Sequence, residues 1–397
     1  MIRSIHPFPA RMAPELALES LAALPPNSTV LDPMSGSGTV VRQAAELGHR
    51  PIGFDMDPLA VLMARVWTTE VDNDLIGQVS ENILDQIKDL GRTKIALPWI
   101  DESDQTKEFV NYWFGKPQQL ALRKVAYVLD EFSKRRYSKE KQAAADIVRI
   151  ALSRIIVTKE QGASLARDTS HSRPHKVSEA SDYDVMEGLE RSIKLVRKRL
   201  SDNPAMGEAS IKLGDARSLR SLKSASIDAV LTSPPYLNAI DYLRGHRMSL
   251  VWLGHRIENL RGIRSSSIGA ERAPDKPQTS IKFKRIANSM CNSTSLSTRY
   301  KSMIERYSQD VYRMVSEISR VTRPGGSATF VVGNSCLKGS FIQNSDGVAT
   351  AAEMLGFQLT HRYERPLPAQ SRYLPITAEG ALGKRMRTET ILSFERQ

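Results

Sequence analysis

Residues 28–58 read STVLDPMSGSGTVVRQAAELGHRPIGFDMDP, and this stretch decides the fold. The β-rich run Ser28–Leu31 is followed by a glycine-containing turn, Ser35–Thr39, which opens a helix. Pro51–Phe54 then reads as a second short strand, and a helix with one apolar face follows it. Strands that alternate with helices in this way predict a parallel, doubly wound α/β sheet.

Two insertions interrupt the sheet pattern. Amphipathic helical stripes alone fill residues 71–204, after which Ser210–Asp215 and Ile227–Thr232 read as buried strands. We therefore predict a core in three parts, separated by a helical insertion and a basic, loop-like insertion. The predicted boundaries are 1–70, 205–243 and 302–397 for the core, 71–204 for the helical insertion and 244–301 for the basic insertion.

The composition is that of a globular protein, with 41% hydrophobic and 25% charged residues in a chain of 397. No stretch approaches the roughly 18–20 apolar residues of a membrane helix. The first residues contain no apolar segment typical of a secretory signal. With only Cys291 and Cys336, we expect neither a disulfide framework nor a multi-cysteine zinc site. These features predict a soluble, cytoplasmic protein.

The charge balance points to a polyanionic partner. The chain carries 56 Lys and Arg against 44 Asp and Glu, a formal net charge of +12. Residues 244–301 hold 12 of these cations and three acids, so this window supplies +9 of the total. Such a concentration is typical of a nucleic-acid-binding patch, although a solvated basic loop is the alternative.

The glycine-containing turn predicts a nucleoside ligand. Gly36 and Gly38 allow a ligand to approach the backbone closely. Val41 stands where a dinucleotide fingerprint requires a third glycine, and no P-loop lysine is present, so a pyrophosphate is not expected. Asp55, at the end of the next strand, can accept hydrogen bonds from ribose hydroxyls, and Asp215 ends a later strand at the same sheet edge. Each acid taken alone could instead be a helix N-cap.

The segment Thr232-Ser233-Pro234-Pro235-Tyr236 carries the sharpest chemical signal. The prolines end the strand and turn the Ser233 side chain and the Pro234 carbonyl outward as acceptors, with the Tyr236 ring beside them. An exocyclic amine on a base is a poor nucleophile because its lone pair is delocalised into the ring. Two acceptors that hold its hydrogens favour a pyramidal nitrogen and orient the lone pair for attack. A rigid structural loop is the alternative interpretation.

Together these motifs resemble the S-adenosylmethionine-dependent DNA amino-methyltransferases, which act on cytosine N4 or adenine N6. The family's cofactor loop, Asp-Pro-Phe-x-Gly-x-Gly-Thr, matches residues 32–39 with Met34 in place of Phe. Its Asp/Asn/Ser-Pro-Pro-Tyr/Phe motif matches Ser233–Tyr236. Residues 6–11, HPFPAR, are similar to the segment that closes over the methionine end of the cofactor. The insertions match no recognition domain.

The resemblance implies a class I methyltransferase-like, Rossmann-like fold with S-adenosyl-L-methionine as cofactor. It implies that the catalytic residues are Ser233, Pro234, Pro235 and Tyr236. The cofactor-binding residues that it implies are Phe8, Pro9, Asp32, Pro33, Ser35, Gly36, Gly38, Thr39, Asp55, Met56, Asp215 and Ala216.

The first residue of the catalytic motif bears on the base. Within the family, Ser-Pro-Pro-Tyr is usual for cytosine-N4 enzymes and Asp- or Asn-Pro-Pro-Tyr for adenine-N6 enzymes. Ser233 therefore favours N4-methylcytosine as the product over N6-methyladenine. Cytosine-C5 methylation is disfavoured because it needs a cysteine nucleophile, normally preceded by proline. Met290 precedes Cys291 and Ser335 precedes Cys336.

The family's enzymes flip the target base out of duplex DNA, so other residues must hold the phosphates. We predict that these come from the basic window and from the polar segment 164–176. The DNA-binding candidates are Arg167, Arg173, Arg244, Arg261, Arg264, Lys282, Lys284 and Arg285. His171 and His175 have the spacing of metal ligands, but Pro174 interrupts the helix that this spacing requires, so no metal is expected.

DNA methylation in restriction–modification, or in a related defence or epigenetic role, is the leading hypothesis, with a cognate restriction or defence partner and no membrane partner. One alternative is an RNA amino-methyltransferase acting on tRNA, because some such enzymes share the sheet and a Pro-Pro-Tyr loop. Another is a catalytically silent nucleic-acid-binding subunit of a methyltransferase complex. The glycine turn, Asp55 and Ser233–Tyr236 together argue against the silent subunit.

Overall fold

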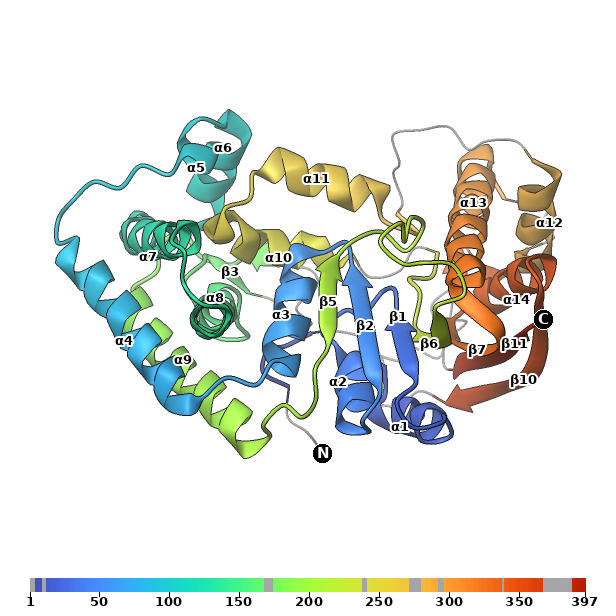
Figure 1. Ribbon diagram of the computed structural model, residues 1–397. Helices are drawn as coiled ribbons and strands as arrows, with labels where there is room; N and C mark the ends of the chain where they lie inside the picture. The colour runs from blue at the N-terminus through green and yellow to red at the C-terminus, as the bar shows by residue number, and fades with distance from the viewer. Residues whose placement is uncertain are drawn as a thin grey trace. The chain divides into compact units, whose positions relative to one another are not determined.

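Figure 1 shows the computed structural model of the chain, which describes residues 4–8, 12–167, 174–237, 241–270, 280–291, 296–337, 339–366 and 388–397. The chain divides into two compact units. One, the sheet unit, contains residues 10–56, 207–240 and 265–397. The other, the helical unit, contains residues 1–9, 57–206 and 241–264.

The sheet unit is built on a seven-stranded sheet. Its strands are β1 (Thr29–Asp32), β2 (Arg50–Asp55), β5 (Ser210–Leu213), β6 (Ile227–Thr232), β7 (Thr322–Gly333), β10 (Phe357–Pro366) and β11 (Thr388–Arg396). The first five are parallel, and β11 pairs antiparallel with β7 and β10. The order β10-β11-β7-β6-β1-β2-β5 confirms the predicted doubly wound α/β sheet.

Helices cover both faces of this sheet. They are α1 (Pro14–Ala22), α2 (Thr39–Glu46), α12 (Ile281–Met290), α13 (Thr298–Val321) and α14 (Asn344–Met354). On β1, Val30 packs in the apolar cluster with α1 and α2, whereas its neighbour Leu31 packs with α12, α13 and α14. Leu231 and Val230 divide in the same way on β6. Because successive residues of a strand point to opposite faces, both faces of the central strands are buried.

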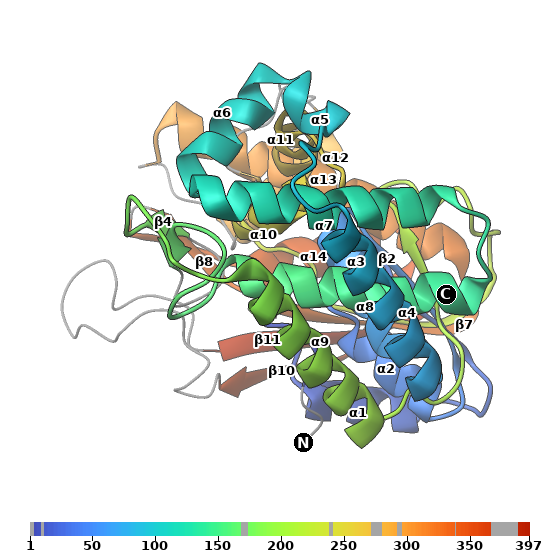
Figure 2. The ribbon, with the colours of Figure 1, turned by 90° about the vertical axis from the view of Figure 1, so that its left-hand side faces the viewer.

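The helical unit includes all of residues 71–204, the predicted helical insertion. Its helices are α3 (Pro58–Thr68), α4 (Asn73–Asp89), α5 (Pro98–Asp101), α6 (Asp104–Trp113), α7 (Lys116–Lys134), α8 (Lys139–Ile156), α9 (Val185–Asp202), α10 (Tyr242–Leu250), the 3-10 turn η1 (Val251–Leu253) and α11 (Ile257–Ser266), whose last two residues belong to the sheet unit. Figure 2 shows α8 beside α4 and α9, against which it packs. The apolar faces of α7, α8 and α9, which belong to the predicted amphipathic stripes, pack in one apolar core.

Two local predictions are wrong, and two short hairpins were not predicted. Strand β5 was expected to be buried but is largely exposed, because it is the edge strand of the sheet. The described part of the basic window is helical rather than a loop: Ile257 and Leu260, at helical spacing, bury one face of α11. Two short hairpins, β3–β4 (Ala166–Arg167, His175–Lys176) and β8–β9 (Ser335–Leu337, Ser340–Ile342), were missed, because strands of two or three residues leave no periodic pattern.

The sheet's central packing gives a stability prediction. Phe330→Ala removes a fully buried ring of β7 that packs edge-on against Phe394, with ring centroids 5.9 Å apart. We expect the free energy of unfolding to fall by about 3–5 kcal/mol, because a cavity replaces the ring. Urea denaturation followed by circular dichroism measures this change. Phe341→Ala is the control, since that ring is 49% exposed, and should cost less than about 0.5 kcal/mol. Equal losses would contradict the assigned core.

Candidate active site at the carboxyl edge of the sheet

The strand order reverses between β1 and β6, which pair in parallel. Open α/β sheets bind ligands at the carboxyl ends of strands that flank such a switch point. Here β1 leads into residues 33–39, the glycine loop, and β6 leads into residues 233–237, the PPY loop. The sheet unit therefore places both sequence motifs at one edge.

Backbone and carboxylate contacts fix the glycine loop. The Ser35 amide donates to the Phe54 carbonyl (2.8 Å), and the Gly36 amide donates to Oδ2 of Asp55 (2.8 Å). Gly36 and Gly38 have φ values of 51° and 92°, in the left-handed region that favours glycine. Asp55 thus braces the loop itself, in addition to its predicted role toward a ribose.

A polar ligand fits this loop. The Oγ atoms of Ser35 and Ser37 are buried and have no hydrogen-bond partner among the described residues. Buried hydroxyls normally have a partner, so these two offer unused bonding capacity where a ligand is predicted. Met56 and Asp55 follow at the adjacent end of β2. This set is compatible with a nucleoside-bearing cofactor.

The PPY loop is fixed at several points. Ser233 Oγ donates to the Val331 carbonyl on β7 (3.0 Å). The buried Tyr307 hydroxyl donates to the Pro235 carbonyl (3.1 Å), and Ser335 Oγ donates to the Leu237 carbonyl (2.6 Å). None of the described residues donates a hydrogen bond to the Pro234 carbonyl. The loop is therefore preorganised, with the lone pairs of Ser233 and Pro234 as its available acceptors.

Tyr236 is packed closely against a second segment. Gly269 has a φ of 76°, and a Cβ at that position would lie 2.8 Å from the Tyr236 carbonyl oxygen. Only glycine allows this approach without displacing the loop. Burial, and secondly the negative charge of Glu389, raises the pKa of Tyr236 to about 12. The phenol therefore stays neutral, and the residue presents an uncharged aromatic ring.

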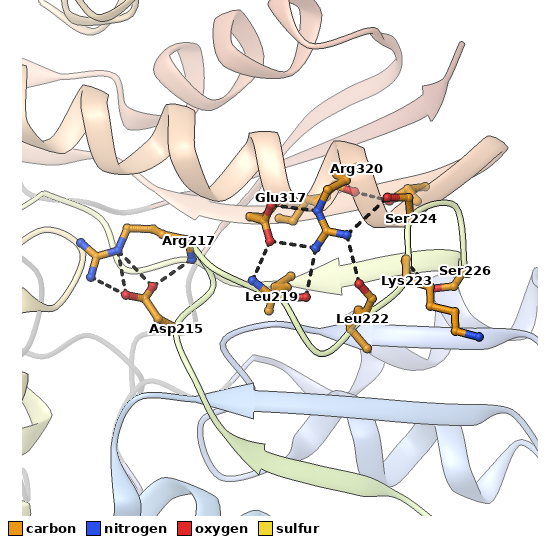
Figure 3. Close-up of polar contacts among 11 residues, drawn as sticks. Asp215, Arg217, Leu219, Leu222, Lys223, Ser224, Ser226, Glu317 and Arg320 are labelled. Carbon is orange, nitrogen blue, oxygen red and sulfur yellow. Dashed lines mark hydrogen bonds and ion pairs between the residues drawn. The ribbon is translucent and has the colours of Figure 1, made fainter.

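Asp215 is engaged by an arginine two residues away (Figure 3). Arg217 donates from Nε to Oδ1 of Asp215 (3.0 Å) and from Nη2 to Oδ2 (2.7 Å). Its Nη1 reaches Oδ1 of Asp310 on α13 (2.7 Å). Although burial lowers it, the hydrogen bonds and charges of Asp215 and Asp310 raise the pKa of Arg217 above its ordinary value. A contact of Asp215 with an adenine ring stays a prediction, as it does for buried Ala216.

The chain that follows is tied to α13, as Figure 3 also shows. Glu317 accepts a hydrogen bond from the Leu219 amide (2.6 Å). Arg320 donates to the carbonyls of Leu219 and Leu222, both at 3.0 Å, and pairs with Glu317 (2.9 Å). The segment after β5 is therefore held rigidly on the helix.

Asp32 and Thr232 connect the two loops across the switch point. Thr232 Oγ1 donates to Oδ1 of Asp32 (2.7 Å), and both residues are buried. The Met34 amide donates to the same oxygen (3.2 Å). Burial, only partly offset by these hydrogen bonds, raises the pKa of Asp32 to about 7, and the charge of Asp55 adds to the shift. A carboxyl group with this pKa is typical of functional sites.

Other predicted residues lie in the helical unit or outside the described ranges. Phe8 stacks on Tyr242, with ring centroids 5.0 Å apart at 16°, and its contact with a cofactor stays a prediction. Arg167 lies on β3 and donates to the Ala166 carbonyl (3.0 Å). Pro9 and Arg173 lie outside the described residues.

The charges of three predicted DNA-binding arginines, Arg264, Arg261 and Arg244, act on another arginine of the helical unit, Arg247. Arg244 on α10 is exposed, and Arg264 on α11 forms an ion pair with Asp241. The Arg247 guanidinium lies 5.2 Å from the Phe109 ring centroid, and its buried Nε has no described partner. Burial and the charge of Arg264 lower the pKa of Arg247. Arg244 and Arg247 therefore carry positive charge for which no carboxylate among the described residues forms an ion pair.

The remaining basic candidates belong to α12 of the sheet unit. Lys282 Nζ donates to the Tyr312 hydroxyl (3.0 Å), while Lys284 and Arg285 are exposed. No group of three or more His, Cys, Asp or Glu side chains suited to a metal occurs within the described ranges. No helix in the described part of the chain has the length and apolar character that crossing a membrane requires.

Comparison with known proteins places this site in context. No family model matches the chain. The chain is 22% identical over 378 residues to the Type II methyltransferase M.BsoBI of Geobacillus stearothermophilus, covering 83% of this chain and 73% of that protein. It is 21% identical over 432 residues to the Type II methyltransferase M.MvaI of Kocuria varians, covering 98% and 90%.

Among solved structures, a SAM-dependent methyltransferase from Methanosarcina mazei matches with 9% identity and a TM-score of 0.34, over 98% of this chain and 99% of that one. The assignment of the fold therefore depends on the strand order described above rather than on this similarity.

Several residues of the site were not predicted from the sequence. Arg217 had a local signal, because it lies two positions after Asp215. Arg247 lay in the basic window but was not singled out. Tyr307 and Ser335 had no signal, since they reach the PPY loop from positions 72 and 98 residues away along the chain.

The buried Asp32 carboxyl predicts a pH-dependent stability. Because its pKa is about 7 in the folded protein and near 4 when unfolded, the folded state binds more protons between these values. Stability relative to Asp32→Asn should therefore fall as the pH rises from about 4 to 7 and stay constant above that. Urea denaturation of both proteins across this range measures the difference. The exposed Asp202→Asn controls for the loss of a charge, and parallel curves for wild type and Asp32→Asn would refute the prediction.

Proposed function

We propose that this protein transfers a methyl group from S-adenosylmethionine to the exocyclic amine of a base in DNA, with cytosine N4 preferred over adenine N6. It acts at a specific site in restriction–modification or a related role. The similarity to two proteins named Type II methyltransferases supports a DNA methyltransferase. The base preference depends on Ser233 as the first residue of the PPY loop.

The observation that carries the proposal is the fixed orientation of Ser233. Its hydroxyl hydrogen is donated to the Val331 carbonyl, so its oxygen lone pairs are left to accept. The Pro234 carbonyl, which receives no hydrogen bond from the described residues, is a second acceptor on the same loop. Two such acceptors hold both hydrogens of an amine and direct its lone pair outward.

Tyr236 supports the flipped base by stacking. With a pKa of about 12 the phenol is neutral near pH 7, so the residue does not act as a base. Its ring is held in place through the loop contacts of Tyr307 and Gly269. Aromatic stacking favours an extruded base without distinguishing cytosine from adenine.

The glycine loop, Asp55 and Met56 would hold the cofactor, with Asp215 and Ala216 near its base. When bound, S-adenosylmethionine supplies an electrophilic methyl group. The chain's own part is to exclude water around the buried Ser35 and Ser37 hydroxyls and to present the target amine from Ser233. The attacking amine is oriented by hydrogen bonds, so the chain needs no covalent nucleophile.

The arginines of α10 and α11 contact the DNA backbone. Arg244 and Arg247 have no carboxylate partner among the described residues, and phosphates would neutralise them. Exposed Lys284 and Arg285 of α12 offer further phosphate contacts.

The reaction is tested by expressing the chain in a methylation-free host and analysing its DNA nucleosides by mass spectrometry. We expect N4-methylcytosine with the wild type and at least about a 100-fold decrease with Ser233→Ala plus Tyr236→Ala, because groups aimed at the transition state are lost. Calorimetry should still detect S-adenosylmethionine binding. Tyr112→Ala, at an exposed ring of the helical unit, is the control. Undiminished methylation in the double variant would refute the site, and modified tRNA with unmodified DNA would support the RNA alternative.

The DNA interface is tested by salt dependence. Arg244→Glu should weaken binding to duplex DNA and reduce the slope of log K against log salt by about 0.9 for each phosphate that the variant no longer neutralises. Fluorescence anisotropy at several salt concentrations gives both quantities. Arg136→Glu, an exposed arginine between α7 and α8, makes the same charge change elsewhere. If both variants lose the same affinity, net charge rather than a local interface explains the binding.

A further inference from the structure

One polar line crosses the carboxyl ends of four adjacent strands in the sheet unit. At β2, Asp55 accepts a hydrogen bond from the Gly36 amide. At β1, Asp32 accepts a second, separate hydrogen bond from Thr232 on β6. The residue after Thr232, Ser233, continues the line to the Val331 carbonyl on β7. The Asp32–Thr232 hydrogen bond is the step that spans the switch point between β1 and β6.

The burial of this pair argues for a specific role. Asp32 is 3% exposed and Thr232 is fully buried. No lysine or arginine among the described residues forms an ion pair with Asp32, so the carboxylate is held by hydrogen bonds alone. An unpaired buried carboxylate is costly, and packing alone would be served as well by an apolar residue.

The two partners act on different loops. Asp32 accepts from the Met34 amide, which belongs to the glycine loop. Thr232 immediately precedes Ser233, whose hydroxyl is the proposed acceptor for the target amine. The hydrogen bond therefore joins the residue that precedes the glycine loop to the residue that precedes the PPY loop.

We propose that Asp32 is a positioning residue, which through Thr232 sets the PPY loop in register with the glycine loop, rather than a residue that contacts the cofactor. The expected effect of Asp32 on catalysis rests on the proposed function, because it assumes that the two loops form the active site. It differs from the role implied by the family resemblance, in which Asp32 belongs to the cofactor-binding set.

The test compares two variants that break the same hydrogen bond from opposite sides. Thr232→Val keeps the branched shape and removes the hydroxyl, whereas Thr232→Ser keeps the hydroxyl and is the matched control. Asp32→Asn keeps the size and removes the charge. The readouts are the S-adenosylmethionine Kd by calorimetry, and kcat and KM for DNA.

We expect Thr232→Val and Asp32→Asn each to lower kcat by about 10- to 100-fold, since a small misplacement of reacting groups has this effect. The cofactor Kd should change less than threefold (an order-of-magnitude bound for residues without direct contact). The double variant should lose no more kcat than either single variant, because each single variant already removes the whole interaction. Thr232→Ser should retain most of the activity.

The pH profile separates positioning from a merely structural role. Among the described residues, the charge of Asp55 on β2 acts on Asp32, and β6 contributes the neutral hydroxyl of Thr232. The wild-type kcat should rise as Asp32 ionises near pH 7, and this rise should be absent in Asp32→Asn. Identical profiles would overturn the proposal.

Two further results would overturn it. One is a cofactor Kd that rises more than about tenfold in Asp32→Asn but not in Thr232→Val, which would place Asp32 on the cofactor. The other is full additivity of the two single variants. The free energy of unfolding can be measured for the two single variants and the double variant without cofactor or DNA. If the two losses of stability are additive, that result counts against an interaction between Asp32 and Thr232 and leaves the proposed function untouched. A wild type that neither binds the cofactor nor methylates DNA counts against the proposed function instead.

Discussion

The hydrogen bond between Asp32 and Thr232 lies where the strand order of the sheet reverses. At that point no helix crosses between the adjacent strands, so the loops after β1 and β6 lie at the same edge of the sheet, and this hydrogen bond joins the strand residues that precede them. The Asp32 carboxyl group makes this contact although burial removes it from water, and the loss of hydration raises its pKa. Both motifs of the proposed active site begin at this pair.

The rest of the sheet unit makes the site rigid. Apolar clusters on both faces hold the strands, and α13 contributes Tyr307 to the PPY loop and Asp310 to Arg217. Loops that are fixed by several independent contacts lose little entropy when a substrate binds. Preorganisation of this kind is what an amine-orienting mechanism requires, because the reaction depends on geometry rather than on a covalent intermediate.

Charge is divided between the two units. The sheet unit holds the acids Asp32, Asp55 and Asp215 at the proposed cofactor site, whereas the helical unit gathers arginines on α10 and α11. The basic window was predicted as a loop because its charge dominates its composition. Its apolar residues at helical spacing decide otherwise, since burying them on one face of a helix leaves the arginines on the other.

The sequence by itself determined the parallel sheet, the glycine loop and the PPY motif, because their signals are local: strand and helix periods, and prolines and glycines with restricted or unusual backbone angles. Only the tertiary structure decided that Tyr307 and Ser335 support the PPY loop and that β5 is an exposed edge strand. Such contacts join residues far apart along the chain or depend on strand order, and no local pattern encodes either. Thr232 belongs to a motif that the sequence shows, but its hydrogen-bond partner Asp32 is identified only by the pairing of β1 with β6 in the structure.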